Sequence, residues 1–251
     1  MQTTTHHFTA ADGQTLAWHE MGERDGRAVI LLHGLFSNAF TNWIRFGHAE
    51  AIAAQGLRVI MMDLRAHGDS AKPHDPAAYP KDVLTTDALA LIAHLGLIDY
   101  DLVGYSLGAR TAARMVAKGA RPRRLVLAGM GLEGLLGTRG RADQFRDVLL
   151  NLGKHERGSP KWMAEAFLKT TKGDPEALLP LLDSWENVGE ADLDKLTMPT
   201  LVVAGDEDRD NGSAPALAER LPDGTYQEVP GGHMSSVTQP ELGAAIAAFL
   251  G

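Results

Sequence analysis

A chain of 251 residues is long enough to fold as one large domain, with or without an inserted segment. Its composition, with 44% hydrophobic and 22% charged residues, is that of a globular protein and excludes a disordered chain. The formal net charge of −8 argues against a nucleic acid partner, and the absence of cysteine excludes disulfides, thiolate metal sites and a cysteine nucleophile.

The N-terminal segment, residues 1–13, is polar and lacks the apolar core of a signal peptide. No apolar run in the chain is long enough to cross a membrane. We therefore expect a cytoplasmic protein with no membrane partner, and nothing in the sequence indicates its oligomeric state. Residues 6–22 predict a β-hairpin that turns at Asp12-Gly13 and joins the edge of a sheet.

Five short apolar runs follow the hairpin, and each is continuous rather than alternating, which is typical of strands buried on both faces. Segments with helical periodicity lie between them. Strands that alternate with helices predict a parallel sheet built from right-handed βαβ units. The predicted strands are residues 28–33, 59–63, 101–106, 123–129 and 200–206, and the predicted helices are 49–55, 83–95, 109–118, 214–221 and 242–250.

The alternation of strands and helices stops between Gly131 and Met198, where no strand-like run occurs. We expect a core domain of residues 1–130 and 199–251, and a helical cap, residues 131–198, over the C-terminal edge of the sheet. The predicted fold class is α/β, with a mostly parallel, doubly wound sheet, an N-terminal antiparallel hairpin and a helical cap insertion. Helical pieces of the cap are predicted at residues 141–153, 161–171 and 176–188.

Reactive side chains follow several of the predicted strands. Ser106 and His33-Gly34 each end a predicted strand, residues 205–208 end the last long one, and His233 follows the final strand. The carboxyl ends of parallel strands meet at the edge where ligands bind. The stretch "GYSLG" fits the motif G-x-S-x-G, in which a serine is presented on a sharp turn between a strand and a helix. The alternative is a serine that only caps the following helix. The context of strand before and helix after favours a nucleophile.

Five motifs of the chain resemble, in sequence and in order, those of the α/β-hydrolase superfamily, and the likeness covers nearly the full length. Within that superfamily the chain is most similar to the small serine esterases that carry a helical cap. The resemblance implies the chain order serine, acid, histidine, which Ser106, Asp208 and His233 match. The five motifs are "HGLF" (33–36), "DLRAHGDS" (63–70), "GYSLGA" (104–109), "GDEDRD" (205–210) and "GGHM" (231–234).

The general base is predicted to be His233. It follows the last strand in a glycine-rich turn, from which an imidazole can reach back to Ser106. By resemblance, His33 supports its loop and does not transfer protons. The charged stretch 63–70 is interpreted as a buried, ion-paired turn, although Ala66 stands where the family usually has glycine.

The acid is predicted to be Asp208. In the superfamily the acid comes three residues after the glycine that ends its strand, so Gly205 selects Asp208, with Asp206 as the alternative. The spacing of these acidic residues also suggests a calcium loop. That hypothesis fails because Asn211 and Leu217 stand where such a loop requires glycine and glutamate.

The oxyanion hole is predicted to consist of two backbone amides, because acyl transfer places negative charge on a carbonyl oxygen. Leu107 follows the nucleophile at the start of a helix, where unpaired N–H groups and the helix dipole favour an anion. By resemblance, the second donor is Leu35, after the His-Gly pair.

The predicted activity is hydrolysis of a small apolar carboxylic ester through an acyl-enzyme, without a metal ion or cofactor. The same triad could act on a C–C bond, a lactone or a thioester, and a non-catalytic small-molecule binding protein is a more distant alternative. Haloalkane dehalogenases and epoxide hydrolases use an aspartate nucleophile, so a serine at position 106 argues against both. The candidate pocket residues are Phe36, Met130, Trp162, Trp185 and Met234.

Overall fold

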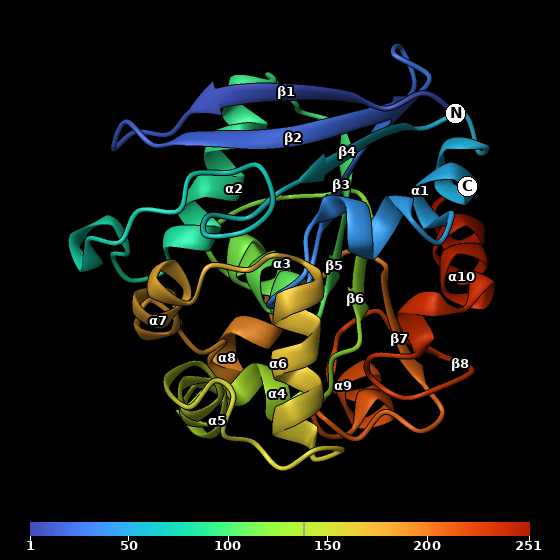
Figure 1. The fold of residues 1–251 in the computed structure, drawn as a ribbon. Coiled ribbons are helices and arrows are strands. Elements are labelled where there is room, and N and C mark those ends of the chain that lie inside the picture. Colours follow the sequence, from blue (N-terminus) through green and yellow to red (C-terminus); the bar gives the residue numbers. More distant parts are fainter. Residues whose placement is uncertain (138) are drawn as a thin grey trace.

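The sheet has eight strands in the described part of the chain. The computed structural model describes residues 1–137 and 139–251, and orders the strands β1-β2-β4-β3-β5-β6-β7-β8 (Figure 1). Strand β2 pairs antiparallel with β1 and with β4, and all other neighbours are parallel. This confirms the predicted mostly parallel sheet with an N-terminal hairpin. The strands are β1 (Thr4–Thr9), β2 (Thr15–Gly22), β3 (Ala28–Leu32), β4 (Arg58–Met62), β5 (Tyr100–Tyr105), β6 (Leu125–Ala128), β7 (Thr200–Gly205) and β8 (Gly224–Val229).

Helices cover both faces of the sheet. Helices α1 and α10 contact each other on one face, and α2 and α3 contact each other on the opposite face (Figure 1). The central strand β3 supplies both cores, because Val29 and Leu31 belong to one fully buried hydrophobic cluster and Ile30 and Leu32 to the other. The helices of this part are α1 (His48–Ala53), α2 (Val83–His94), α3 (Leu107–Ala117), α9 (Ala214–Arg220) and α10 (Pro240–Leu250), with short turns η1 (Phe40–Ile44), η2 (Pro76–Ala78) and η3 (Ser236–Thr238).

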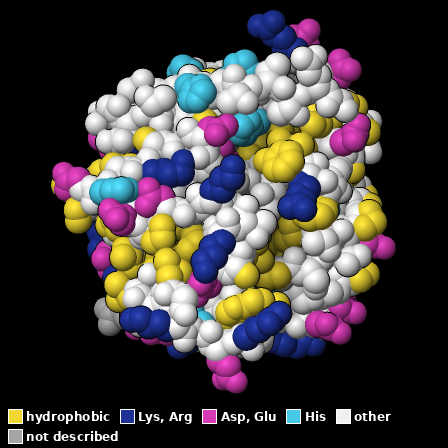
Figure 2. Space-filling view, in the orientation of Figure 1, with side chains coloured by type: hydrophobic (Ala, Val, Ile, Leu, Met, Phe, Trp, Pro, Cys, Tyr) yellow, Lys and Arg dark blue, Asp and Glu magenta, His cyan; other side chains and the backbone are white. Residues whose placement is uncertain are grey.

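A helical insertion separates β6 from β7, as predicted. Its helices gather at one end of the molecule in Figure 1, and their apolar side chains join the same hydrophobic cluster as α2 and α3. On the face drawn in Figure 2, hydrophobic side chains form separate patches, with Lys and Arg side chains spread between them. Across the described residues, no helix has both the length and the apolar character that a membrane span requires. The inserted helices are α4 (Leu132–Leu136), α5 (Arg139–Leu150), α6 (Pro160–Thr170), α7 (Pro175–Asp183) and α8 (Glu190–Leu193).

The predicted helix 176–188 is too long, because α7 ends at Asp183. The backbone beyond it bonds to other helices instead of continuing the turn. The Ser184 carbonyl accepts from the Asp82 amide at 2.8 Å, and the Asn187 carbonyl accepts from the Arg114 side chain at 2.9 Å. As a result, Trp185 lies in a connector that passes over α2 and α3.

Candidate active site

Ser106 sits on a strained turn between β5 and α3. Its φ of 53° and ψ of −109° lie outside the regions that L-residues ordinarily adopt, and such strain is typical of functional positions. Ser106 occupies the N-cap position of α3, yet its hydroxyl does not cap the helix. The observed geometry therefore speaks against a purely capping serine.

The two glycines of the motif are required by backbone contacts. A Cβ atom at Gly104 would lie 2.2 Å from the Gly108 carbonyl oxygen, and one at Gly108 would lie 2.1 Å from the Leu32 carbonyl oxygen. Real Cβ atoms do not approach backbone oxygens so closely. The glycines thus let β3, β5 and α3 meet at the serine, as the motif predicts.

The structure brings the three predicted triad side chains into one hydrogen-bonded chain. His233 Nε2 lies 3.0 Å from Ser106 Oγ, and His233 Nδ1 lies 2.9 Å from Asp208 Oδ2. An ionised carboxylate can only accept, so the proton between His233 and Asp208 belongs to Nδ1. This tautomer leaves the Nε2 lone pair free to accept the serine proton.

The electrostatics around Asp208 favour its charged form. Burial raises the pKa of this carboxyl, but the hydrogen bond from His233, its positive charge and the Asp210 amide together hold the pKa below its ordinary value. The Asp208 side chain is only 4% exposed and that of His233 only 10% exposed. A carboxylate that stays ionised beside the imidazole stabilises the imidazolium form.

The loop that carries His233 is fixed by two contacts that the sequence analysis did not identify. The Asp206 carboxylate accepts from the Gly231 amide at 2.7 Å, so this alternative acid holds the loop and does not contact the imidazole. The Tyr105 hydroxyl donates to the His233 carbonyl at 2.5 Å and lies 3.0 Å from Ser236 Oγ. In the sequence, the position of Tyr105 directly before the motif serine could have indicated this contact.

In the predicted oxyanion hole, the amides on both sides of Leu35 are already engaged in hydrogen bonds. Gly34 N–H donates to Asn42 Oδ1 at 3.0 Å, and Phe36 N–H donates to His67 Nε2 at 3.2 Å. Within residues 1–137 and 139–251, the amides of Leu35 and Leu107 donate to no protein acceptor. Both therefore remain available to a ligand oxygen.

The charged stretch 63–70 forms the buried turn that was predicted. Arg65 pairs with Asp87 at 2.8 Å, and His67 is held between the Phe36 amide and the Arg65 carbonyl. Burial, together with the charge of His33, lowers the pKa of His67 to about 3, so its imidazole is neutral. Ala66 adopts the left-handed conformation with φ of 70°, which explains why the family usually has glycine there.

The same turn contains the arrangement closest to a metal site among the described residues. His19, Asp63 and Asp69 place one potential ligand atom each within 4.8 Å of one another. Asp63 is already engaged, because its two oxygens accept from the Ala39 amide at 2.7 Å, the Asp69 amide at 2.8 Å and His19 at 3.1 Å. We interpret the group as part of the hydrogen-bonded turn.

A family model described as the alpha/beta hydrolase family matches residues 29–246. The chain belongs to the alpha/beta hydrolase family. It is 29% identical over 231 residues to the non-heme chloroperoxidase of Kitasatospora aureofaciens, with 80% of each protein covered. Its fold matches that of an esterase from Exiguobacterium antarcticum, with a TM-score of 0.79, 18% identity, and 97% of this chain and 98% of that chain covered.

Several curated relatives match this chain over only a part of their own length. The acetyltransferase component of the acetoin cleaving system from Pseudomonas putida is 36% identical over 124 residues, which is 48% of this chain and 31% of that protein. The chain thus spans less than half the length of such relatives. The names of these relatives indicate widely different activities, so family membership alone does not fix the substrate.

Two of the predicted pocket residues of this alpha/beta hydrolase meet in an aromatic cluster formed by Phe36, Phe145 and Trp185. The Phe36 and Phe145 rings are 5.4 Å apart and those of Phe145 and Trp185 are 6.4 Å apart, both edge to face. Thr171, at the end of α6, donates to the Phe36 carbonyl at 2.6 Å and ties the insertion to the Leu35 loop. Phe145 was missed because an aromatic residue in an amphipathic helix does not reveal which side chains it meets.

The other three candidate pocket residues do not join this cluster. Met130 is buried, with 2% exposure, and lies against Gly134. Trp162 and Met234 are 37% and 45% exposed. Their assignment to a substrate pocket stays a prediction.

Proposed function

We propose that this protein is a serine hydrolase that cleaves a carboxylic ester through an acyl-enzyme intermediate. The observation that supports this most strongly is the chain of hydrogen bonds from Ser106 Oγ through His233 to Asp208, at 3.0 Å and 2.9 Å. The geometry matches the requirement that base and nucleophile lie within hydrogen-bonding distance, with a third group orienting the base.

In the first half of the reaction, Ser106 Oγ attacks the ester carbonyl carbon while its proton passes to His233 Nε2. The carbonyl oxygen becomes an oxyanion, which the amides of Leu35 and Leu107 stabilise. Removing one such donor typically costs 10²- to 10³-fold in rate. The imidazolium, paired with Asp208, then protonates the departing alkoxide, and the acyl group remains on Ser106.

In the second half, His233 takes a proton from water, which attacks the acyl-enzyme. The tetrahedral intermediate collapses, the carboxylic acid is released, and the proton returns to Ser106 Oγ. Residues 131–198 act as a cap in this proposal. Their aromatic side chains, with Phe36, offer the apolar wall against which the acyl group packs.

The experiment that tests the proposal compares the wild type with Ser106→Ala on para-nitrophenyl butyrate. We expect kcat to fall by about 10⁶-fold, because removal of a triad nucleophile leaves only the oxyanion hole and binding. Ser213→Ala is the matched control, since Ser213 is a capping serine whose hydroxyl accepts from the Ala216 amide at 3.1 Å. It should lower stability by about 1 kcal/mol and leave kcat unchanged.

Retained turnover in Ser106→Ala would contradict the proposed nucleophile. A stopped-flow burst of one nitrophenol per protein would support the acyl-enzyme, whereas a pure binding protein would release none. A panel of an ester, a thioester, a lactone and a diketone, run with both proteins, identifies the bond that is cleaved.

A further inference from the structure

Arg110 is a buried cation without a counter-charge among the residues that the structure describes. It is only 5% exposed, and its Nη1 atom has no hydrogen-bond partner. Arg65, the other buried arginine in the described ranges, is paired with Asp87 at 2.8 Å and with Asp12 at 2.5 Å. Burying an unpaired guanidinium is costly, so a fold that retains one without a protein acid calls for an explanation.

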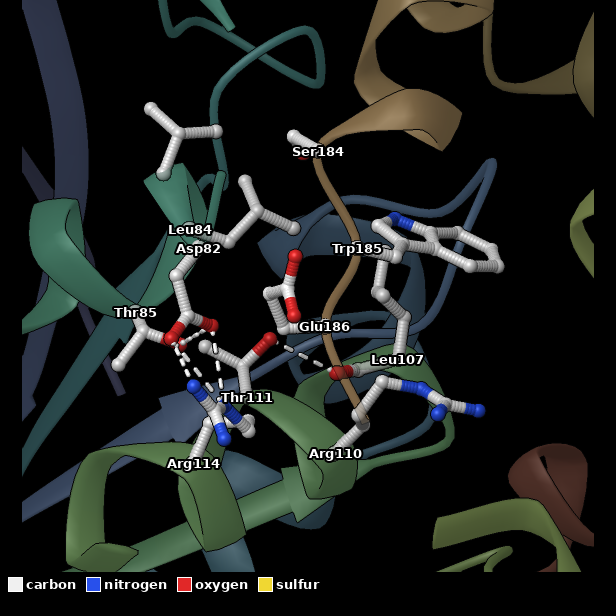
Figure 3. A pocket seen from close by; sticks show the side chains of 11 residues that line it. Asp82, Leu84, Thr85, Leu107, Arg110, Thr111, Arg114, Ser184, Trp185 and Glu186 are labelled. Atoms are coloured by element: carbon white, nitrogen blue, oxygen red, sulfur yellow. Dashed lines mark hydrogen bonds and ion pairs between the residues drawn. The ribbon is translucent and has the colours of Figure 1, made fainter. Parts of the chain in front are cut away.

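The position of Arg110 connects it to the proposed catalytic serine. Residues four apart on a helix lie on the same face, and Arg110 follows Ser106 by one turn of α3. Arg110 also lines a hollow together with Leu107, whose amide is a proposed oxyanion donor. Figure 3 shows the Arg110 guanidinium extending to the side of Trp185, away from the pair formed by Asp82 and Arg114.

The surroundings of Arg110 are aromatic and cationic. Its guanidinium lies 5.8 Å from the Trp185 ring, and that of Arg141 lies 5.3 Å from the Phe145 ring. The aromatic cluster therefore carries an arginine against each of these two rings. Burial, reinforced by the charge of Arg141, lowers the pKa of Arg110 to about 10, which still leaves it charged at neutral pH.

The acidic side chains of the hollow are already neutralised. Asp82 is paired with Arg114 and lies 3.5 Å from Lys118, and Glu186 lies 3.4 Å from Lys81. Arg141 has a loose contact of 3.6 Å with Asp210. The positive charge near Trp185 is thus left for a ligand.

We propose that Arg110 binds a carboxylate group of the substrate, with Arg141 adding to the local positive charge. The inference rests on the proposed function and deepens it: the substrate is an ester whose apolar chain ends in a carboxylate, such as a half-ester of a dicarboxylic acid. The ester carbonyl lies at Ser106, the chain lies along the aromatic cluster, and the carboxylate accepts from Arg110, since arginine and carboxylate form short, charge-assisted hydrogen bonds.

The test uses two esters that differ only at the far end of the chain, mono-para-nitrophenyl adipate, which ends in a carboxylate, and methyl para-nitrophenyl adipate, which ends in a neutral methyl ester. For the wild type we expect kcat/KM to be about 10- to 100-fold higher for the half-ester, chiefly through KM, and this ratio should shrink with added salt. Arg110→Met should bring the ratio close to one, and Arg110→Lys should retain part of it. Lys118→Met, which removes an exposed charge from the end of the same helix, should keep the wild-type ratio.

Calorimetric titration of adipate measures the anion site without turnover. Adipate should bind to Ser106→Ala, and the double variant with Arg110→Met should lose that binding. If the methyl ester is hydrolysed through Ser106 but the half-ester is not preferred and adipate does not bind, the carboxylate inference is wrong and the proposed function stands. If adipate binds through Arg110 while neither ester is hydrolysed, the anion site stands and the proposed function fails. If kcat/KM fell by the same factor for both esters in Arg110→Met and in Arg110→Lys, the arginine would contribute to packing alone.

Discussion

Two groups of aspartate and histidine side chains lie at the carboxyl ends of parallel strands of the sheet, and among the described residues only one of them is bonded to a serine on a strained turn. In the turn after β4, His67 bonds to the Phe36 amide and the Arg65 carbonyl. Asp63 bonds to the Ala39 and Asp69 amides and to His19, whose other ring nitrogen lies 3.0 Å from the Thr5 hydroxyl. Beside β5, β7 and β8, His233 bonds to Asp208 on one side and to the Ser106 hydroxyl on the other. The comparison teaches that a chain of carboxylate, imidazole and hydroxyl does not by itself define a candidate active site. Thr5 lies on the edge strand β1, whereas Ser106 lies on a strained turn at the start of α3.

The largest expected loss of activity among the tests of this comparison is at Asp208, the acid of the group that contains Ser106. Asp208→Asn should lower kcat on para-nitrophenyl butyrate by about 10⁴-fold, because an amide no longer fixes the tautomer with the Nε2 lone pair toward Ser106. Steady-state kinetics of the purified variant provide the measurement.

Asp206→Asn is the matched control for Asp208→Asn, since the two residues share the same loop. The Asp206 carboxylate contacts the Gly231 amide and not the imidazole, so its amide variant should retain most of kcat. If Asp206→Asn lost as much activity as Asp208→Asn, the distinction between the two acids would be wrong.

A smaller effect is expected from the buried histidine of the first group. The folded protein holds the pKa of His67 at about 3, against an ordinary value of 6.5. As the pH falls from 7 to 5, the unfolded chain therefore protonates this imidazole and the folded protein does not. Stability is therefore lost on acidification, by about 2 kcal/mol from this group between pH 7 and pH 5. Urea unfolding of the wild type and of His67→Gln should be measured at pH 7 and pH 5. Between these pH values, the free energy of unfolding of the wild type should fall by about 2 kcal/mol more than that of the variant.

The two proteins in that experiment share every other titrating group. His67→Gln keeps an oxygen that can accept from the Phe36 amide but has no imidazole to protonate. Equal acid sensitivity of the two proteins would mean that His67 is not held neutral in the fold.

The smallest effect is expected at Ala66. Glycine would relieve the left-handed backbone, but it would lose a buried methyl group and gain freedom in the unfolded chain, so these contributions oppose each other. Ala66→Gly should change the free energy of unfolding by less than about 1 kcal/mol and leave kcat unchanged. Urea unfolding and ester kinetics measure both quantities, and a large loss of either would show that the methyl group has a further role.

Much of the molecule could be predicted because its cues are local in the sequence. Continuous apolar runs gave the parallel strands, and glycine, serine and histidine in fixed motifs located the rim at which Ser106 and His233 meet. The end of α7 could not be predicted, since it depends on Ser184 and Asn187 bonding to α2 and α3. The unpaired state of Arg110 was equally hidden, because a missing partner is a property of the packed molecule.

The hydrogen bond from Tyr105 to the His233 carbonyl fastens the loop of the imidazole directly to the strand that bears the serine. Strands β6 and β7, which flank the inserted helices, are themselves adjacent and paired from Leu125 with Thr200 onward. The proposed catalytic groups are thus aligned by the sheet, while the insertion emerges between two strands that would be neighbours without it. In the proposed function, a different insertion at this point would change which molecules are accepted while the groups beneath it keep their alignment.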